Sequence, residues 1–217
     1  MIIILLSFIA SYNQPIWGID NPLPVLLNHG EVYIHFRDEP VNKVRAKLGV
    51  GIWNSIILGV SYGGDNLVSY GDVDWEDQPS LDLRMRLFES EWVESVVGFN
   101  NEPIEHFSGK DLFITAGFRL YVGSFRVLLC GGGNYNFTEN GEKGVDIFAN
   151  TVLNINGPHS IHAEYILGAN DDNDNSKNRF NIGYRIQSGA LGVELDIKNI
   201  FSGDLGRQIQ IFYRENF

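Results

Sequence analysis

Apolar and polar residues alternate along most of this chain of 217 residues, and the alternation limits the possible fold more than any other feature. In the stretch 81–87, LDLRMRL, the apolar side chains fall on one face of an extended chain and the charged side chains on the other. The stretches 43–52, KVRAKLGVGI, and 191–198, LGVELDIK, divide in the same way. A period of two residues predicts β-strands with one apolar and one polar face.

Strands of this kind are expected along the chain from residue 30 onward. They cover 30–37, 43–52, 55–62, 80–88, 92–99, 111–121, 124–136, 143–155, 159–168, 178–186, 189–199 and 207–217. Most are close to the ~9 to 11 residues with which a tilted strand crosses a bilayer, and their number is even.

The connections between the expected strands alternate in length. Tight turns are expected at 53–54, 89–91, 122–123, 156–158 and 187–188, and longer segments at 38–42, 63–79, 100–110, 137–142, 169–177 and 200–206. Short periplasmic turns and longer external loops are typical of outer-membrane barrels. The sequence therefore predicts an all-β fold, an up-and-down antiparallel transmembrane β-barrel of about 12 strands.

A soluble secreted barrel that binds an apolar ligand would show the same alternation with the opposite polarity, and it stays an alternative. The beginning of the chain favours the transmembrane barrel over the soluble barrel. Residues 2–10 are apolar, too few to cross a bilayer as a helix, and they predict a signal peptide over 1–18, although no basic residue precedes them. A buried first strand is the other interpretation. The barrel domain is then expected over 19–217.

The end of the chain, RQIQIFYRENF, also alternates and finishes on an aromatic residue. A closing strand must pair with the first strand, because an open sheet edge is not tolerated in lipid. This ending resembles the signal of outer-membrane proteins that the barrel-assembly machinery reads. The resemblance assigns that role to Ile209, Ile211, Tyr213 and Phe217.

The charged faces of the strands are expected to line the lumen. The charged residues expected there are Lys43, Arg45, Lys47, Asp82, Arg84, Arg86, Arg119, Arg126, Glu164, Arg179, Arg185, Glu194, Asp196 and Lys198. Because bases outnumber acids in this set, the lumen could favour an anionic solute or polymer. The alternative is a narrow lumen filled by arginine and carboxylate side chains that pair with one another.

Other chemistry is not expected. A net charge of -11 argues against nucleic acid as a partner, and Cys130 is the single cysteine, so no internal disulfide can form. Ser160, His162 and Glu164 share a strand face, but a spacing of ~7 Å between such side chains predicts no direct hydrogen bond, and no enzyme is predicted. No cofactor is expected.

A metal site is not expected either. The weak candidate is Asp172, Asp174 and Ser176, whose alternate spacing suits oxygen ligands. This loop has neither the glycine nor the final glutamate of a calcium loop, so a solvated loop is favoured.

The stretch 80–120 resembles the YjbH-like outer-membrane proteins, which are associated with exopolysaccharide production. The match lies in Leu81–Glu89, Val96–Phe99 and Gly109–Leu120. The resemblance implies a non-enzymatic barrel in the bacterial outer membrane, surrounded by lipid, that acts as a small channel or envelope component for an anionic solute or exopolysaccharide. A structural or adhesive barrel whose acidic loops bind an external partner is the second interpretation.

Overall fold

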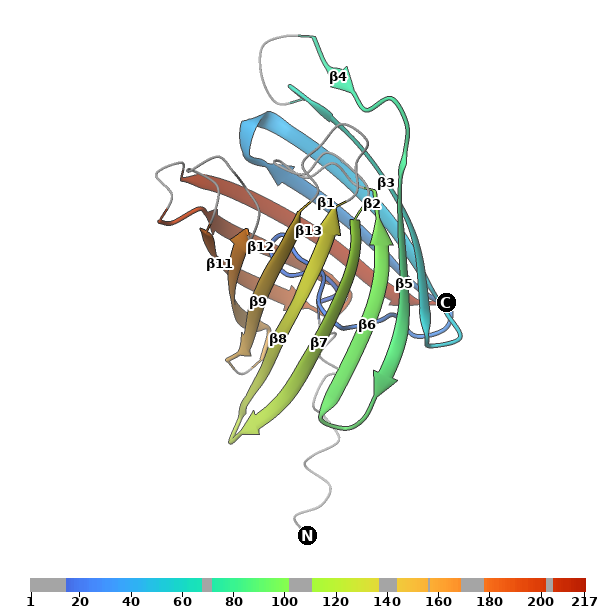
Figure 1. Cartoon of the computed structure of the whole chain (residues 1–217), viewed down its shortest axis with the longest axis vertical. Helices are drawn as coiled ribbons and strands as arrows, with labels where there is room; N and C mark the ends of the chain where they lie inside the picture. The colour runs from blue at the N-terminus through green and yellow to red at the C-terminus, as the bar shows by residue number, and fades with distance from the viewer. Residues whose placement is uncertain are drawn as a thin grey trace.

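The chain folds into one closed barrel of antiparallel strands (Figure 1). The computed structural model describes residues 15–67, 72–101, 111–136, 144–155, 157–168, 178–201 and 205–217. The strands are β1 (Glu31–Glu39), β2 (Lys43–Ile52), β3 (Ile56–Asp65), β4 (Asp74–Trp75), β5 (Ser80–Glu89), β6 (Val93–Asn100), β7 (Asp111–Val122), β8 (Phe125–Asn136), β9 (Val145–Asn154), β10 (His159–Gly168), β11 (Asn178–Ser188), β12 (Leu191–Lys198) and β13 (Gly206–Asn216).

Twelve of these strands close the circle, and each pairs with its neighbours along the chain. The strand β1 pairs with β2 on one side and with β13 on the other, and β2 also pairs with β3. The two-residue strand β4 lies outside the circle and pairs with the last two residues of β3. The predicted fold class and strand number are therefore confirmed, whereas β4 was not expected. A short 3₁₀ helix, η2 (Pro40–Asn42), joins β1 to β2.

The tight turns lie at one end of the barrel, but three of them are displaced from their predicted positions. They occupy 90–92, 123–124 and 189–190 instead of 89–91, 122–123 and 187–188. Gly123 and Gly189 have φ angles of 61° and 59°, in the left-handed region that glycine adopts most readily. In the last two turns the glycine, rather than the end of the apolar alternation, marks the turn.

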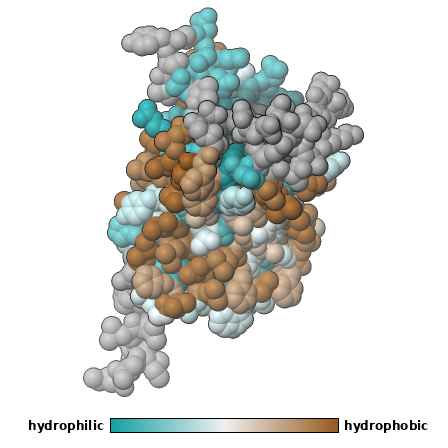
Figure 2. Space-filling view, turned by 60° about the vertical axis from the view of Figure 1, so that its left-hand side comes forward, coloured by the Kyte–Doolittle hydropathy of each residue, from teal (hydrophilic) through white to brown (hydrophobic). Residues whose placement is uncertain are grey.

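The apolar faces of the strands point outward and the charged faces point inward. Leu83, Leu195 and Ile211 are 44%, 55% and 44% exposed, whereas Arg84 and Glu194 have no exposed surface. Figure 2 shows the resulting hydrophobic surface on one face of the wall. A soluble barrel that holds an apolar ligand needs the opposite polarity, so that alternative is wrong, and the barrel is of the transmembrane type.

Exposed aromatic residues lie near both ends of the wall. Trp92 and Tyr121 make an edge contact at the end with the tight turns, with 6.0 Å between ring centroids. At the other end Tyr62 stacks on Trp75 of β4, with 5.8 Å between centroids. Such residues are typical of the two interfaces of a bilayer. None of the described residues forms a helix long and apolar enough to span a membrane.

Placing a charge within the apolar band should destabilise the barrel in lipid. We expect Leu195→Arg to lower the free energy of unfolding in lipid vesicles by ~2 to 4 kcal/mol, because Leu195 lies on the lipid face of β12. The matched control is Leu205→Arg, since Leu205 is also exposed but precedes β13. Equal effects of the two substitutions on denaturant unfolding would contradict this placement of the band.

The assembly signal stays a prediction, and the structure suggests how to test it. Ile209 and Ile211 face outward, and Phe217 is 88% exposed, so Phe217→Ala removes little buried contact. We expect the variant to unfold like the wild type after refolding in detergent, but to insert poorly in cells, measured by heat-modifiable gel migration of the membrane fraction. Phe201→Ala, at another exposed aromatic, is the control and should insert normally.

Candidate functional site

Residues 15–28, which we call the plug segment, lie inside the barrel instead of preceding it (Figure 1). All residues from 15 to 27 are buried. The segment makes a tight turn in which the Gly18 amide donates to the Asn21 carbonyl at 2.8 Å and the Leu23 amide donates to the Ile16 carbonyl at 3.0 Å. Pro22 and Pro24 follow the turn, and proline lacks the amide that a ladder needs. The segment therefore crosses the lumen as an irregular chain.

One wall carboxylate holds this turn. Glu164, on β10, accepts hydrogen bonds from the backbone amides of Asp20 at 3.1 Å and of Asn21 at 2.9 Å. Asn181, on β11, donates to Glu164 at 3.0 Å. A Cβ atom at Gly18 would lie 3.1 Å from Glu164 Oε2, so the turn approaches the carboxylate closely. Hydrogen bonds to a buried carboxylate are among the stronger ones in proteins, so Glu164 is a principal anchor of the plug segment.

The side chain of Asp20 forms a second anchor. Its Oδ1 lies 2.9 Å from Lys198 Nζ, and its Oδ2 accepts a hydrogen bond from Asn181 at 3.0 Å. Burial opposes the charged form of Asp20, but the nearby charges of Lys198, Arg37 and Arg179 hold its pKa below the ordinary value. The carboxylate of the plug segment therefore lies against cations that the wall supplies.

Trp17 lies among basic side chains of the wall. Lys47 Nζ is 3.8 Å and Arg84 Cζ is 4.0 Å from the centre of the indole ring, which are cation–π distances. Arg84 also donates to the Ile16 carbonyl at 2.9 Å, and Gln208 donates to the Ile19 carbonyl at 3.2 Å. The wall thus satisfies backbone carbonyls that a strand would have satisfied within a sheet.

The remainder of the plug segment packs on apolar residues that face the lumen. Two clusters form: Leu23 and Val25 with Leu128, Cys130 and Val152, and Ile16, Trp17, Leu26 and Leu27 with Tyr33, Ile57, Val96, Phe113 and Phe212. Two wall glycines leave room for the segment. A Cβ at Gly51 would lie 2.0 Å from the Asn28 carbonyl oxygen, and one at Gly117 would lie 2.6 Å from Pro24 Cγ.

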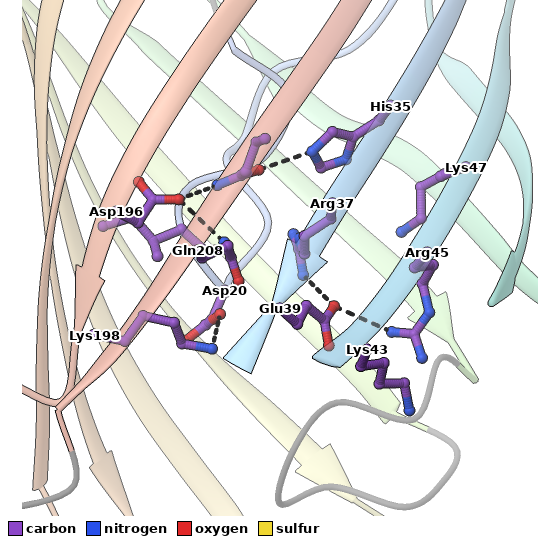
Figure 3. Close-up of polar contacts among 12 residues, drawn as sticks. Asp20, His35, Arg37, Glu39, Lys43, Arg45, Lys47, Asp196, Lys198 and Gln208 are labelled. Carbon is purple, nitrogen blue, oxygen red and sulfur yellow. Dashed lines mark hydrogen bonds and ion pairs between the residues drawn. The ribbon is translucent and has the colours of Figure 1, made fainter. Parts of the chain in front are cut away.

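Basic side chains of β1 and β2 lie close together on the wall of the lumen (Figure 3), and a further one lies on β5. This basic cluster consists of Arg37, Lys43, Arg45, Lys47 and Arg84. Acidic residues lie among them: Arg45 is 3.5 Å from Glu39 and 2.5 Å from Glu76, and Lys47 is 3.6 Å from Asp82. Glu39 and Glu76 were not among the predicted lumen residues, because the sequence placed them in the connections 38–42 and 63–79.

Charges of both signs also lie on β10 to β12, which β13 separates from β1. Glu194 pairs with Arg185, whose Nε donates to it at 2.5 Å. Asp196 accepts hydrogen bonds from Gln210 at 2.7 Å and from Gln208 at 3.1 Å, and Gln210 also bonds to His35 at 2.8 Å. The plug segment therefore meets charges of both signs, with Lys47 and Arg84 near Trp17 and with Glu164 and Lys198 near Asp20.

The structure corrects the expected separation of Ser160 and His162. Their Oγ and Nε2 atoms are 3.4 Å apart, within hydrogen-bond reach, because both side chains lean toward each other on β10. His162 Nδ1 is 2.8 Å from Glu194, and not bonded to Glu164. The order serine, histidine, carboxylate resembles a hydrolase triad. Ser160 has no exposed surface and Arg185 shares Glu194, so no substrate reaches the hydroxyl in this arrangement.

The other predicted lumen residues lie elsewhere on the wall. Arg86 and Arg119 both pair with Glu94, the former at 3.1 Å, and Arg179 is buried on β11. Arg126 is half-buried on β8, near the tight turns. The candidate metal residues Asp172, Asp174 and Ser176 lie outside the described residues.

The free space beside Trp17 of the plug segment is small. A cavity of about 10 Å³ lies next to Trp17 and is bordered by His35, Arg185 and Gln210. This is near the lower limit for one water molecule. The part of the lumen around Trp17 is therefore closed by the plug segment.

Solved porin structures are similar to this barrel. The KdgM porin superposes with a TM-score of 0.56 at 9% sequence identity, covering 86% of this chain and 99% of that chain. The KdgM porin in complex with disordered oligogalacturonate has a TM-score of 0.54 at 11% identity, with the same coverage. No protein-family model matches the chain, and no curated protein matches its sequence. The likeness shows a porin-like fold.

Weakening the Glu164 anchor should loosen the plug segment. We expect Glu164→Gln to speed hydrogen exchange at the amides of Asp20 and Asn21 by about tenfold to a hundredfold, because a hydrogen bond to a charged group contributes ~1.5 to 3 kcal/mol. The matched control is Glu94→Gln, a buried wall glutamate paired with Arg86 and Arg119. Unchanged exchange in Glu164→Gln would show that Glu164 is not an anchor.

Proposed function

We propose that this protein is a porin-like channel of the bacterial outer membrane that admits anionic solutes and is closed by its plug segment. The basic cluster beside Trp17 carries the proposal. Arg84 and Lys47 contact the indole ring, so displacement of the plug segment would expose both cations to the lumen. Clustered cations on the wall of a narrow pore favour anions.

Two similarities suggest the class of solute. A KdgM porin with this fold has been solved with oligogalacturonate, an acidic oligosaccharide. The stretch 80–120 resembles proteins associated with exopolysaccharide. An acidic saccharide carries carboxylates, and Asp20 of the plug segment presents a carboxylate to Lys198 of the wall. We therefore infer that an anionic saccharide competes with the plug segment for the lumen.

The rest of the proposal concerns processing and surroundings. We propose that a signal peptide directs the chain to the envelope, that the barrel-assembly machinery inserts it into outer-membrane lipid, and that the protein is not an enzyme. The position at which the signal peptide is cleaved determines which residues of the plug segment the mature protein keeps. Cleavage near Ile19 would remove Ile16 and Trp17, whereas cleavage before Pro15 would keep all the contacts described above. Sequencing the amino terminus of the mature protein distinguishes these cases.

Unseating the plug segment should open the channel. We expect Gly51→Ala to raise the open probability in planar bilayers at least about tenfold, which corresponds to ~1.4 kcal/mol, because a Cβ at this position collides with the Asn28 carbonyl. Gly131→Ala is the control, since the nearest atom to a Cβ there lies 3.8 Å away. The open state should prefer chloride over potassium, and Lys47→Gln should weaken that preference.

The recordings can also refute the proposal. A cation-selective current through Gly51→Ala would overturn the assignment to anionic solutes. If neither glycine variant carries current although gel migration shows a folded barrel, the proposal that the protein is a channel is overturned.

A further inference from the structure

Glu164 is a buried carboxylate of β10 that forms no ion pair within the part of the chain that the structure describes. The residue is 1% exposed, and its hydrogen-bond donors are the amides of Asp20 and Asn21 and the side chain of Asn181. The charge that acts on it is that of Asp20, which has the same sign. A buried carboxylate normally pairs with a cation, so Glu164 is suited to bind a positively charged group.

The turn of the plug segment brings the backbone at Gly18 against this carboxylate. A Cβ atom at Gly18 would lie 3.1 Å from Glu164 Oε2 and 3.1 Å from the Asn21 carbonyl oxygen. The Asp20 amide nitrogen, on the other side of Ile19, is 3.1 Å from Glu164 Oε1. The peptide bond between Gly18 and Ile19 therefore lies between two groups that approach Glu164 closely.

Asn150, on β9, supplies a second buried side chain at the same place. It is the direct cross-strand partner of Glu164, and its Nδ2 lies 3.5 Å from the position of a Cβ at Gly18. The residue is 4% exposed, and its Oδ1 and Nδ2 are both buried without a hydrogen-bond partner. A half-turn about the last side-chain bond exchanges these two atoms. Asn150 can therefore offer an oxygen acceptor beside Glu164.

A positively charged group with several N–H donors would satisfy Glu164 and Asn150 together. We propose that the signal peptide is cut after Gly18 and that the new α-ammonium group of Ile19 binds these two side chains. Hydrolysis of this peptide bond consumes a water molecule, leaves a carboxylate on Gly18 of the released peptide and gives Ile19 an ammonium group. An ammonium group has three N–H donors, and the Asn21 carbonyl, which loses the Gly18 amide, can accept the third.

Gly18 suits this cleavage by its size and by its position in the sequence. Signal peptides end on small residues after the apolar run, and Gly18 ends the predicted segment 1–18. Ala10 and Ser11 are also small, but a cut after either would leave Ile19 inside the chain. Because residues 15–27 are all buried in the closed barrel, the cut must precede assembly.

Cleavage after Gly18 would separate the two ends of the plug segment. Trp17 would leave the basic cluster, whereas the turn around Asp20 would stay and gain an ion pair with Glu164. The mature protein would then have an uncovered basic cluster beside a turn that an ion pair holds. The inference rests on the signal peptide proposed above, but not on the channel.

The test uses the full chain, expressed in bacteria and purified in detergent from the outer-membrane fraction. Sequencing of the amino terminus should give Ile19 as the first residue, and any other first residue would overturn the proposal. The protein is then treated with an amine-selective acylating reagent, and the amino-terminal peptide is quantified by mass spectrometry. Ile19 should react at least about tenfold more slowly in the folded barrel than in urea, because the seated ammonium group reacts only after the site opens.

Variants distinguish this site from burial alone. Glu164→Gln keeps the shape but removes the charge, so it should be cut at the same bond, and its Ile19 should react at least about tenfold faster than in the wild type. Asn150→Ala should also react faster, although this side chain has no hydrogen-bond partner in the uncut chain. The control is Glu94→Gln, at a buried wall glutamate that pairs with arginines, and it should react like the wild type. Equal reaction rates of Ile19 in the wild type and in Glu164→Gln would refute the site.

The bilayer recordings described above test the channel separately. A barrel that begins at Ile19 and protects its amine, but carries no current, would support this site and overturn the channel. A barrel that carries an anion-selective current but begins at or before Pro15 would support the channel and overturn this site.

Discussion

Backbone amides and carbonyls cannot be left unpaired in hydrocarbon, and this constraint determines the rest of the structure. The pairing of β1 with β13 removes the last open edge, so the first and last strands of the chain become neighbours. Once the sheet is closed, each strand has one face in lipid and one in the lumen. The charges that alternate with the leucines and isoleucines must then lie inside, where water is scarce and each charge needs a partner.

The plug segment supplies partners for some of these charges inside the lumen. Lys198 finds its counterion in Asp20, and Glu164 finds amide donors in the turn of the plug segment. Removing the segment would leave these wall groups to water or to a solute with similar groups. Buried ion pairs contribute modestly to stability while intact, but they are costly when one partner is lost. The same contacts therefore both close the lumen and define which molecules could replace the plug segment.

The sequence predicted the features that depend on local periodicity. It did not predict the contacts between residues that are far apart in the chain. Strand positions follow from alternation, so most bounds agree within two residues, and the charges of β5 or β12 could be assigned to one face. The plug segment has no period because Pro22 and Pro24 interrupt it, and the apolar residues before it resemble a signal peptide. The pairing of Gln208 with Ile19 joins residues 189 positions apart. An idealised strand spacing also takes no account of the tilt of the side chains, which brings Ser160 close to His162.

The direct connection of the plug segment to β1 has a consequence for the order of folding. Gly30, which joins them, donates to Gly51 of β2 and accepts a hydrogen bond from Phe217. The ribosome makes the turn around Asp20 before it makes the wall partners of that turn, which lie on β10 to β13. The turn therefore lacks these anchors until the barrel is nearly complete, and its seating coincides with closure of the ring. A part of the chain that is made early is thus among the last to reach its native position.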